Sequence, residues 1–170
     1  MSRTTAQSMA MGTLVRHLME TMQPTIRQAT VADHERLEAL QRLASLATGE
    51  HHQELLDNPG VFGVAPENIA HSFVAELDGE VVGFCTMLPR SAEVAEVDAV
   101  FIDPGAWRQG IGRMLLIEAE RRAAHAGIRT LGVTSGGYAV SFYQALGFRL
   151  SGTEMTDFGP ADRLTKDVRG

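Results

Sequence analysis

The sequence is poor in cysteine, in long apolar runs and in positive charge. Its one cysteine, Cys85, cannot form a disulfide within the chain, and no apolar run approaches the roughly 18 residues of a membrane span. The chain has 15 Lys and Arg against 21 Asp and Glu, a net charge of −6. That balance argues against sequence-independent binding to nucleic acid, which depends on neutralising phosphates, and mildly favours a cationic substrate. We therefore expect a cytoplasmic protein without membrane or nucleic-acid partners.

The length of 170 residues fits one domain, and the sequence contains no internal repeat or low-complexity tract. We place this domain at residues 24–170. Residues 1–23 carry apolar side chains largely on one helical face but have no signal-peptide core, so we predict a short amphipathic extension. It is a docking arm for a second subunit in a homodimer, a mobile extension, a poorly ordered terminus, or sequence upstream of a later natural start.

The adjacent histidines His51 and His52, followed by Glu54, raise the question of a metal site. Adjacent residues do not face the same way on a helix, and no second pair with ligand spacing occurs elsewhere in the chain. We therefore predict no metal site and assign these side chains to the surface.

Alternation, helical spacing and turn residues predict strands and helices in a regular order. Asp78-Gly79 is a strong hairpin signal because both residues tolerate positive φ, and Gly127 is a helix terminator. The predicted segments are a strand at 25–29, a helix from about 30 to 49, hairpin strands at 72–77 and 80–88, a strand at 96–102, a helix at 110–126, a strand at 130–134, a short helix at 138–146, and strands at 148–153 and 163–168.

The stretch from 96 to 116 carries the clearest chemical signal. A strand ends at Pro104, and a loop with Gly110 and Gly112 then opens a helix. The N–H groups that begin a helix have no backbone partners and carry partial positive charge, so the loop predicts a phosphate cradle. The dinucleotide fingerprint fails because Leu115 occupies its third glycine position, and the Walker loop fails because the stretch ends Gly112-Arg113-Met114.

The strand before this loop carries two carboxylates. Simple alternation places Glu96, Asp98, Val100 and Ile102 on one face, and the intervening residues on the other. A carboxylate beside an anion site is a suitable proton acceptor. The alternative for both residues is a solvated strand-end charge, and for Asp98 that interpretation is equally good.

The loop resembles the cofactor motif of the GCN5-related N-acetyltransferases, the GNAT superfamily, with Pro104, Gly110-Ile111-Gly112-Arg113 and Leu115-Leu116 in register. Trp107, followed by Arg108, stands where the family usually has Arg or Gln. A second stretch, Ala139-x-x-Phe142-Tyr143-x-x-Leu146-Gly147-Phe148, resembles another signature of the same superfamily at the expected distance. Gly136 replaces an asparagine that many relatives keep, and Ser135 is the candidate substitute.

The resemblance implies a fold, a co-substrate and a set of site residues. The fold is α/β, a mixed and mostly antiparallel sheet of six or seven strands with about four helices, in which strands four and five are parallel and splayed. Acetyl-CoA would bind there, with Glu96 as the base, Asp98 as a second candidate, and Tyr143 near the cofactor sulfur as proton donor. His51, His52 and Glu54 lie in a region that often forms the wall of the acceptor pocket in this family, so they are candidates for substrate specificity. The implied cofactor-binding residues are Val100, Phe101, Ile102, Arg108, Gln109, Gly110, Ile111, Gly112, Arg113, Ser135 and Tyr143.

The function that follows is transfer of an acetyl group from acetyl-CoA to a primary amine of a small molecule by direct attack in a ternary complex. Three alternatives stay open. A non-catalytic acyl-CoA sensor would use the loop without Glu96 or Tyr143, a protein N-terminal or lysine acetyltransferase would share the chemistry, and a pure interaction domain would bind no CoA.

Overall fold

The computed structural model describes residues 13–14 and 23–169 of the chain. The predicted amphipathic extension over residues 1–23, with its proposed docking role, therefore lies outside the described residues apart from positions 13, 14 and 23. The boundary between this extension and the domain stays a prediction.

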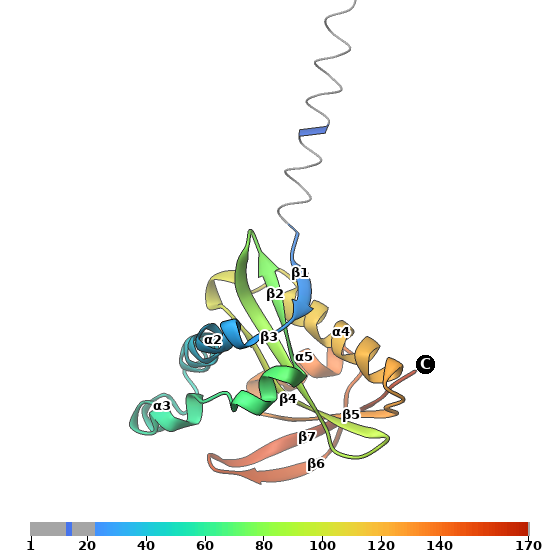
Figure 1. The fold of residues 1–170 in the computed structure, drawn as a ribbon. Helices are drawn as coiled ribbons and strands as arrows, with labels where there is room; N and C mark the ends of the chain where they lie inside the picture. Colours follow the sequence, from blue (N-terminus) through green and yellow to red (C-terminus); the bar gives the residue numbers. More distant parts are fainter. Residues whose placement is uncertain (1–12, 15–22, 170) are drawn as a thin grey trace, which may run out of the picture.

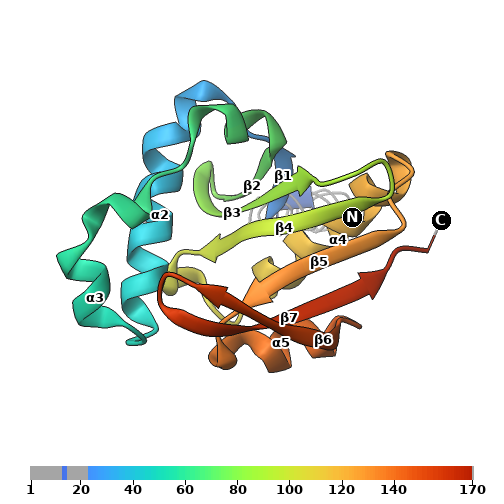
Figure 2. The same cartoon turned by 90° about the horizontal axis from the view of Figure 1, so that it is seen from below.

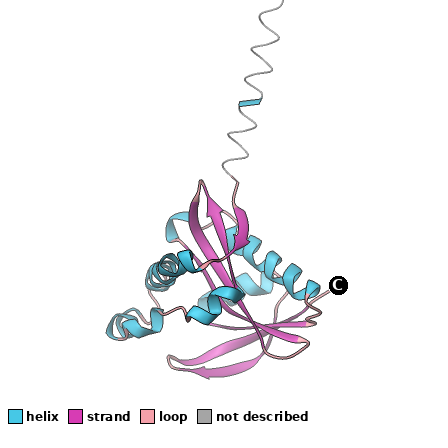
Figure 3. Cartoon of the chain, in the orientation of Figure 1, coloured by secondary structure: helices cyan, strands magenta, loops and turns pink. Residues whose placement is uncertain are grey.

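One seven-stranded sheet organises the structure, in the order β1-β2-β3-β4-β5-β7-β6. Figure 3 shows the strands of this sheet in magenta and the helices around it in cyan. Every neighbouring pair is antiparallel except β4 and β5, which run parallel. The predicted mixed, mostly antiparallel sheet is confirmed. Its strands are β1 (Thr25–Gln28), β2 (Ser72–Leu77), β3 (Glu80–Pro89), β4 (Val94–Ile102), β5 (Thr130–Ser135), β6 (Arg149–Thr156) and β7 (Gly159–Asp167).

Within residues 23–169, four α-helices accompany the sheet: α2 (His34–Ala47), α3 (His52–Asp57), α4 (Ile111–His125) and α5 (Val140–Ala145). Figure 2 shows α4 and α5 behind β4, β5 and β7, with α2 and α3 beside the end of β4. The predicted loop between the first helix and the hairpin contains α3 and the 3-10 helices η2 (Pro59–Phe62) and η3 (Pro66–His71). Short 3-10 turns also precede α2, α4 and α5, namely η1 (Val31–Asp33), η4 (Pro104–Ala106) and η5 (Gly137–Ala139).

Residues with positive φ mark several strand and helix ends at the positions predicted from the sequence. Asp78 and Gly79 join β2 to β3 with φ of 52° and 81°, as a hairpin turn with two left-handed residues requires. Helix α4 begins after Gly110 at φ 77° and ends before Gly127, also at φ 77°. The predicted hairpin and the predicted limits of this helix are confirmed.

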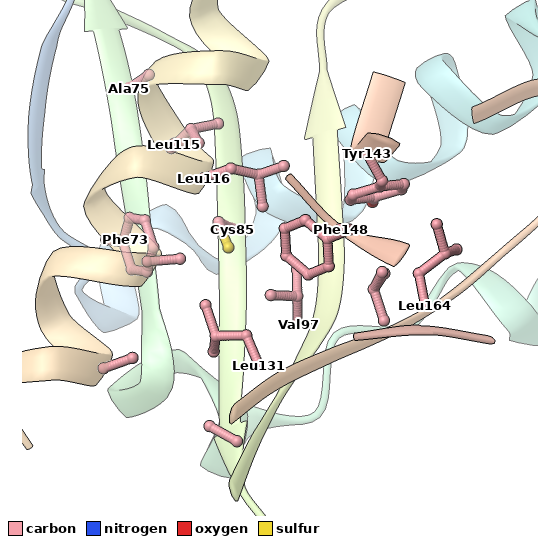
Figure 4. Packing of buried hydrophobic residues seen from close by; sticks show 14 of the residues in the cluster. Phe73, Ala75, Cys85, Val97, Leu115, Leu116, Leu131, Tyr143, Phe148 and Leu164 are labelled. Carbon is pink, nitrogen blue, oxygen red and sulfur yellow. The ribbon is translucent and has the colours of Figure 1, made fainter. Parts of the chain in front are cut away.

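Figure 1 shows α2 on one side of the central strands and α4 on the other. Two apolar clusters fill the space between the sheet and these helices. The larger cluster packs the sheet against α4 and α5 and includes Leu115, Tyr143 and Phe148 (Figure 4). The smaller cluster packs the other face against α2 through Leu37, Leu40 and Phe84. Cys85 lies in the larger cluster and is fully buried, so its assignment as a small apolar core residue is confirmed.

An ion pair joins the start of α2 to β1 and gives a first prediction. Arg27 donates hydrogen bonds of 2.8 and 2.9 Å to the carboxylate of the buried Asp33, and this lowers the pKa of Asp33 to about 2. Because the folded pKa lies below the unfolded value, the pair stabilises the protein above about pH 4, and the stabilisation is lost as the pH falls toward 2. Asp33→Asn should lower the free energy of unfolding by about 1–2 kcal/mol at pH 7.

Urea unfolding at pH 7 and at pH 2.5 tests this prediction. The difference between Asp33→Asn and the wild type should shrink at the lower pH, whereas Asp157→Asn, at an exposed turn, should change stability little at either pH. An equal loss at both pH values would show that the ionised carboxylate is not the stabilising group.

Candidate active site

The site forms where β4 and β5 separate. The strands pair only from Val94 opposite Thr130 to Glu96 opposite Gly132, and no further pairs join them. A cavity of about 720 Å³ opens beyond this fork, within the usual size of a small-molecule pocket. Its wall consists of Ala44, Ala47, Thr48, Val97, Asp98, Ala99, Val100, Phe101, Ile102, Ala106, Trp107, Arg108, Gly110, Ile111, Gly112, Arg113, Val133, Thr134, Ser135, Gly136, Tyr138, Ala139, Phe142 and Tyr143.

The loop that precedes α4 forms one end of the cavity. Arg108 and Gly110 adopt left-handed backbone conformations, with φ of 62° and 77°, and turn the chain into α4. The first N–H groups of this helix have no partner one turn back and concentrate partial positive charge. Of the six predicted cradle residues, all except Gln109 line the cavity. The loop can therefore receive a phosphate group of a ligand in the cavity.

Gly112 connects the two sequence signatures in space. A Cβ atom added at this position would lie 3.1 Å from Phe142 Cζ and 3.3 Å from Ile102 Cδ1. Its lack of a side chain lets the first turn of α4 pack against α5 and the end of β4. The second glycine of the loop is thus needed for packing, whereas Gly110 is needed for its backbone conformation.

Trp107 has a clear structural role at the end of β4. Its indole Nε1–H donates a 2.8 Å hydrogen bond to the carbonyl oxygen of Ile102. The side chain lines the cavity and is 42% exposed. This departure from the usual Arg or Gln thus ties the loop to the strand that precedes it.

A β-bulge at Asp98 overturns one prediction from alternation. On β3, Thr86 faces Ala99 and the adjacent Met87 faces Val97, so Asp98 is an extra residue in β4. The bulge reverses which side chains share a face. Val97 and Val100 both pack in the α4 cluster, whereas Ala99 and Phe101 pack on the α2 side. The prediction that Glu96, Asp98, Val100 and Ile102 share one face is therefore wrong.

The two carboxylates of β4 occupy different environments. Asp98 lines the cavity with a half-exposed side chain, 3.8 Å from Arg90, and partial burial raises the pKa of this carboxyl group. Glu96 is buried, does not line the cavity, and is ion-paired with Arg163 of β7. Of the two candidate bases, Asp98 is the one that borders the cavity.

Tyr143 reaches the cavity from α5. Its ring packs edge-on against Phe142 and Phe148, with centroid distances of 5.2 and 5.6 Å, and the residue is buried. Figure 4 shows Tyr143 and Phe148 on the same side of the sheet. Burial raises the pKa of this phenol above its ordinary value. Within the described residues its hydroxyl has no hydrogen-bond partner, so it is a neutral donor available to a ligand.

These two signatures prove to mark a known family. Residues 36–148, about two-thirds of the chain, match the model of the acetyltransferase (GNAT) family. The chain belongs to the GNAT family. A relative, an uncharacterised N-acetyltransferase of Methanocaldococcus jannaschii, is 37% identical over 86 residues. That alignment covers 45% of this chain and 38% of the length of the relative.

Solved GNAT structures share the fold at low sequence identity. A PaiA N-acetyltransferase from Thermoplasma acidophilum, in complex with coenzyme A, has a TM-score of 0.67 and 21% identity over 86% of this chain and 99% of its own. A GNAT acetyltransferase from Elizabethkingia anophelis with acetyl-CoA bound has a TM-score of 0.64 and 20% identity over 85% and 97%. The family match thus confirms the predicted family of acetyltransferases, and these two structures confirm its fold.

Some residues that line the cavity were not predicted from the sequence, and some predicted wall residues do not line it. Thr48, Thr134 and Tyr138 line the wall. The wall candidates His51, His52 and Glu54 do not, although the His51 ring lies 5.5 Å from that of Phe158 in the β6–β7 turn. Only long-range packing brings these segments together, which is why local patterns did not reveal them.

Ser135 and Gly136 lie at the position where the family resemblance predicted an asparagine. Ser135 lines the cavity, but its hydroxyl donates a 2.9 Å hydrogen bond to the carbonyl oxygen of Gly136. A Cβ atom at Gly136 would lie 3.0 Å from Tyr138 Cε1 and 3.2 Å from Glu50 Oε2. A glycine here makes room for both side chains, and a larger residue would displace them.

No group of three or more potential metal ligands occurs among residues 13–14 and 23–169. In the same part of the chain, every helix is too short or too polar to cross a membrane.

The packing of Gly112 gives a second prediction. Gly112→Val would push branched carbons into Phe142 and Ile102 and shift the start of α4, and overpacking of this kind typically costs about 1–3 kcal/mol. Because the cradle N–H groups would move with the helix, we expect acetyl-CoA affinity to fall at least about tenfold. Calorimetry with acetyl-CoA measures this loss.

The matched control is Gly60→Val, because a Cβ atom at Gly60 meets nothing within 4 Å. That variant should keep the wild-type affinity. Equal affinities for Gly112→Val and the wild type would show that the helix start is not part of the binding site.

Proposed function

We propose that this protein transfers an acetyl group from acetyl-CoA to a primary amine of a small molecule. The observation that carries the proposal is the cavity at the β4–β5 fork. It joins an anion cradle at the start of α4 to a carboxylate, Asp98, and a phenol, Tyr143, in one wall. Acetyl transfer to an amine requires a site for a phosphorylated thioester, a proton acceptor and a group that stabilises the departing sulfur.

The residues present fit acetyl-CoA. Beyond the fork, β4 has no β5 partner, so Val100, Phe101 and Ile102 offer backbone groups along the cavity to an extended ligand. The cradle from Arg108 to Arg113 supplies N–H groups and two arginines to a pyrophosphate. Of the predicted cofactor contacts, Gln109 has the weakest support because it lies outside the cavity wall.

Asp98 is the better-supported proton acceptor. An amine attacks the thioester carbonyl through its nitrogen lone pair, so the proton of its ammonium form must leave. Asp98 borders the cavity, and its raised pKa makes it a stronger base than an exposed aspartate. Glu96, our first candidate, lies behind it, and its proton-accepting role would require a water molecule between the carboxylate and the amine.

Tyr143 supplies the hydrogen bond to sulfur. When the C–S bond breaks, the electron pair stays on sulfur and the thiolate needs a donor. Because burial raises the pKa of this phenol, full proton transfer from it is less favourable than for a free tyrosine. Tyr143 therefore acts mainly by donating a hydrogen bond to the developing thiolate.

The acceptor side favours a small amine over a folded polypeptide. The segment leading into α3 meets the β6–β7 turn, with the rings of His51 and Phe158 5.5 Å apart. Figure 2 shows the tip of this hairpin directed toward α2 and α3. Thr48, three residues before His51, lines the cavity. We therefore propose that this contact limits the space in front of the cavity, so that a compact acceptor fits more readily than a polypeptide segment.

Calorimetry with acetyl-CoA, followed by mass spectrometry of an amine panel, tests the proposal. The panel holds spermidine, L-lysine, kanamycin and a peptide with a free N-terminus. We expect binding and an added acetyl group on one of the small amines. Absence of binding at millimolar acetyl-CoA would overturn the assignment of the co-substrate. Binding without turnover would favour a sensor, and acetylation of the peptide alone would favour a protein acetyltransferase.

A further inference from the structure

An ion pair between a buried carboxylate and a partly exposed guanidinium lies at the floor of the fork, and the reaction outlined above does not use it. Glu96 of β4 is bonded to the guanidinium of Arg163, which comes from β7 on the far side of β5. Arg163 also donates a 3.2 Å hydrogen bond to Thr134 Oγ1, and Thr134 lines the cavity. The pair therefore spans three neighbouring strands directly beneath the cavity wall.

Gly132 of β5 makes this contact possible. A Cβ atom at Gly132 would lie 2.8 Å from Glu96 Oε2 and closer still to the guanidinium of Arg163. Any side chain here would push the two apart. Gly132 is also the last β5 residue paired with β4, so the gap in side chains occurs where the strands diverge.

Carboxylates outnumber cationic side chains around the pair. Glu96 contacts Arg163, and the next carboxylate on the strand is Asp98, whose own cation, Arg90, is 3.8 Å away. Glu154 of β6 accepts a 2.6 Å hydrogen bond from the hydroxyl of Thr134 and acts on Arg163 from the outside. Helix α2 adds no charge to this wall, to which it contributes Ala44 and Ala47.

We infer that Arg163 is a positioning residue of the proposed acetyl transfer. By crossing Gly132, it holds the Glu96 carboxylate in place and neutralises it behind Asp98, so that the cavity-facing carboxylate can lose its proton at a lower pH. The inference rests on the proposed function. Its basis is electrostatic, because a second carboxylate without a counter-charge disfavours ionisation of the first, and an opposite charge within a few ångströms favours it.

Two variants test the inference in different ways. Arg163→Met removes the guanidinium, and Gly132→Ala leaves every charge in the chain but displaces Arg163 from Glu96. For both we expect the acidic limb of the pH dependence of kcat to move upward by about one pH unit or more. Arg163→Lys should restore part of the shift, and KM for acetyl-CoA should stay close to the wild-type value because the cradle is at the other end of the cavity.

The measurement is acetyl transfer from acetyl-CoA to the panel amine that the wild type acetylates fastest, at a series of pH values. Carboxyl carbon NMR of the protein, assigned with Glu96→Gln and Asp98→Asn, follows the same titration without an acceptor. Arg149→Met on the neighbouring strand β6 is the control, since this arginine is exposed and should leave the profile unchanged. Circular dichroism establishes that each variant is folded.

The two ideas fail in different ways. If the wild type acetylates none of the amines, the proposed function is overturned and this inference with it. If the wild type is active but Arg163→Met and Gly132→Ala lower only the rate or the stability, without moving the acidic limb, Arg163 has a structural role alone. Should Arg163→Met not fold, Gly132→Ala decides the question by itself.

Discussion

Replacing Asp98 with asparagine should lower kcat by about 10²- to 10⁴-fold, the usual contribution of a general acid or base. Asparagine has nearly the same shape but cannot accept the proton of the attacking amine. The side chain lies at a bulge in the cavity wall, and its ion pair with Arg90 is exposed and 3.8 Å long, so little stability depends on it. Affinity for acetyl-CoA should therefore change little.

The rate of the wild type should depend on pH through the ionisation of Asp98. Burial raises the pKa of Asp98, so the carboxyl group becomes an effective base only above the ordinary aspartate range near pH 3.9. The wild-type rate should rise with pH through that limb, and the limb should vanish in Asp98→Asn. Steady-state kinetics across pH, with Asp167→Asn at the exposed end of β7 as control, measures both effects. A full rate in Asp98→Asn would return the base role to Glu96.

Replacing Tyr143 with phenylalanine should lower kcat by about 10²-fold, which is typical for the loss of one hydrogen-bond donor aimed at developing charge. The ring packs between Phe142 and Phe148, so phenylalanine preserves both edge-on contacts. The phenol has no partner among the described residues, which means that its removal strands no buried group. Stability and acetyl-CoA affinity should therefore be nearly unchanged.

The rate of Tyr143→Phe is best compared with thioesters of different leaving-group acidity. If the phenol stabilises the thiolate, the defect should shrink for an acetyl thioester whose thiol is more acidic than that of CoA. Ile117→Val, at an exposed position of α4 outside the cavity wall, is the control. A Tyr143→Phe variant with the wild-type rate would remove this residue from the mechanism.

Local sequence signals were sufficient where one short segment determines its own conformation. The hairpin at Asp78-Gly79, the glycine before α4 and the glycine after it each follow from positive φ. The conformation of the loop before α4 could be predicted because its glycine and the helix start are adjacent in the chain, whereas its phosphate-binding role stays a prediction. Burial of Cys85 also followed from the apolar character of its strand.

Features that depend on contacts between strands could not be predicted in this way. The bulge at Asp98 arises from the register of β4 on β3, and nothing in the alternation of β4 marks it. One inserted residue was enough to separate Glu96 from the face that carries Val100 and Ile102. The wrong assignment to one face therefore concerned Glu96 and Asp98, the two candidates for the base.

Arg163 is a second case. It lies 67 residues from Glu96 in the sequence, and its strand shows no motif. The signal that could have identified the contact is Gly132, a glycine in the middle of an otherwise ordinary strand. Glycine in a strand interior often marks the close approach of another group, but the sequence does not say which group.

Because Cys85 is buried, the native protein should not react with thiol reagents. Cys85 has the only sulfhydryl in the chain, and none of its surface is exposed. A thiol-reactive dye mixed with the folded enzyme and acetyl-CoA would therefore be coloured by released CoA alone, without correction for the catalyst. In denaturant, unfolding exposes the thiol of Cys85, and the same dye then reacts with one thiol per unfolded molecule. One reagent therefore measures both turnover and unfolding.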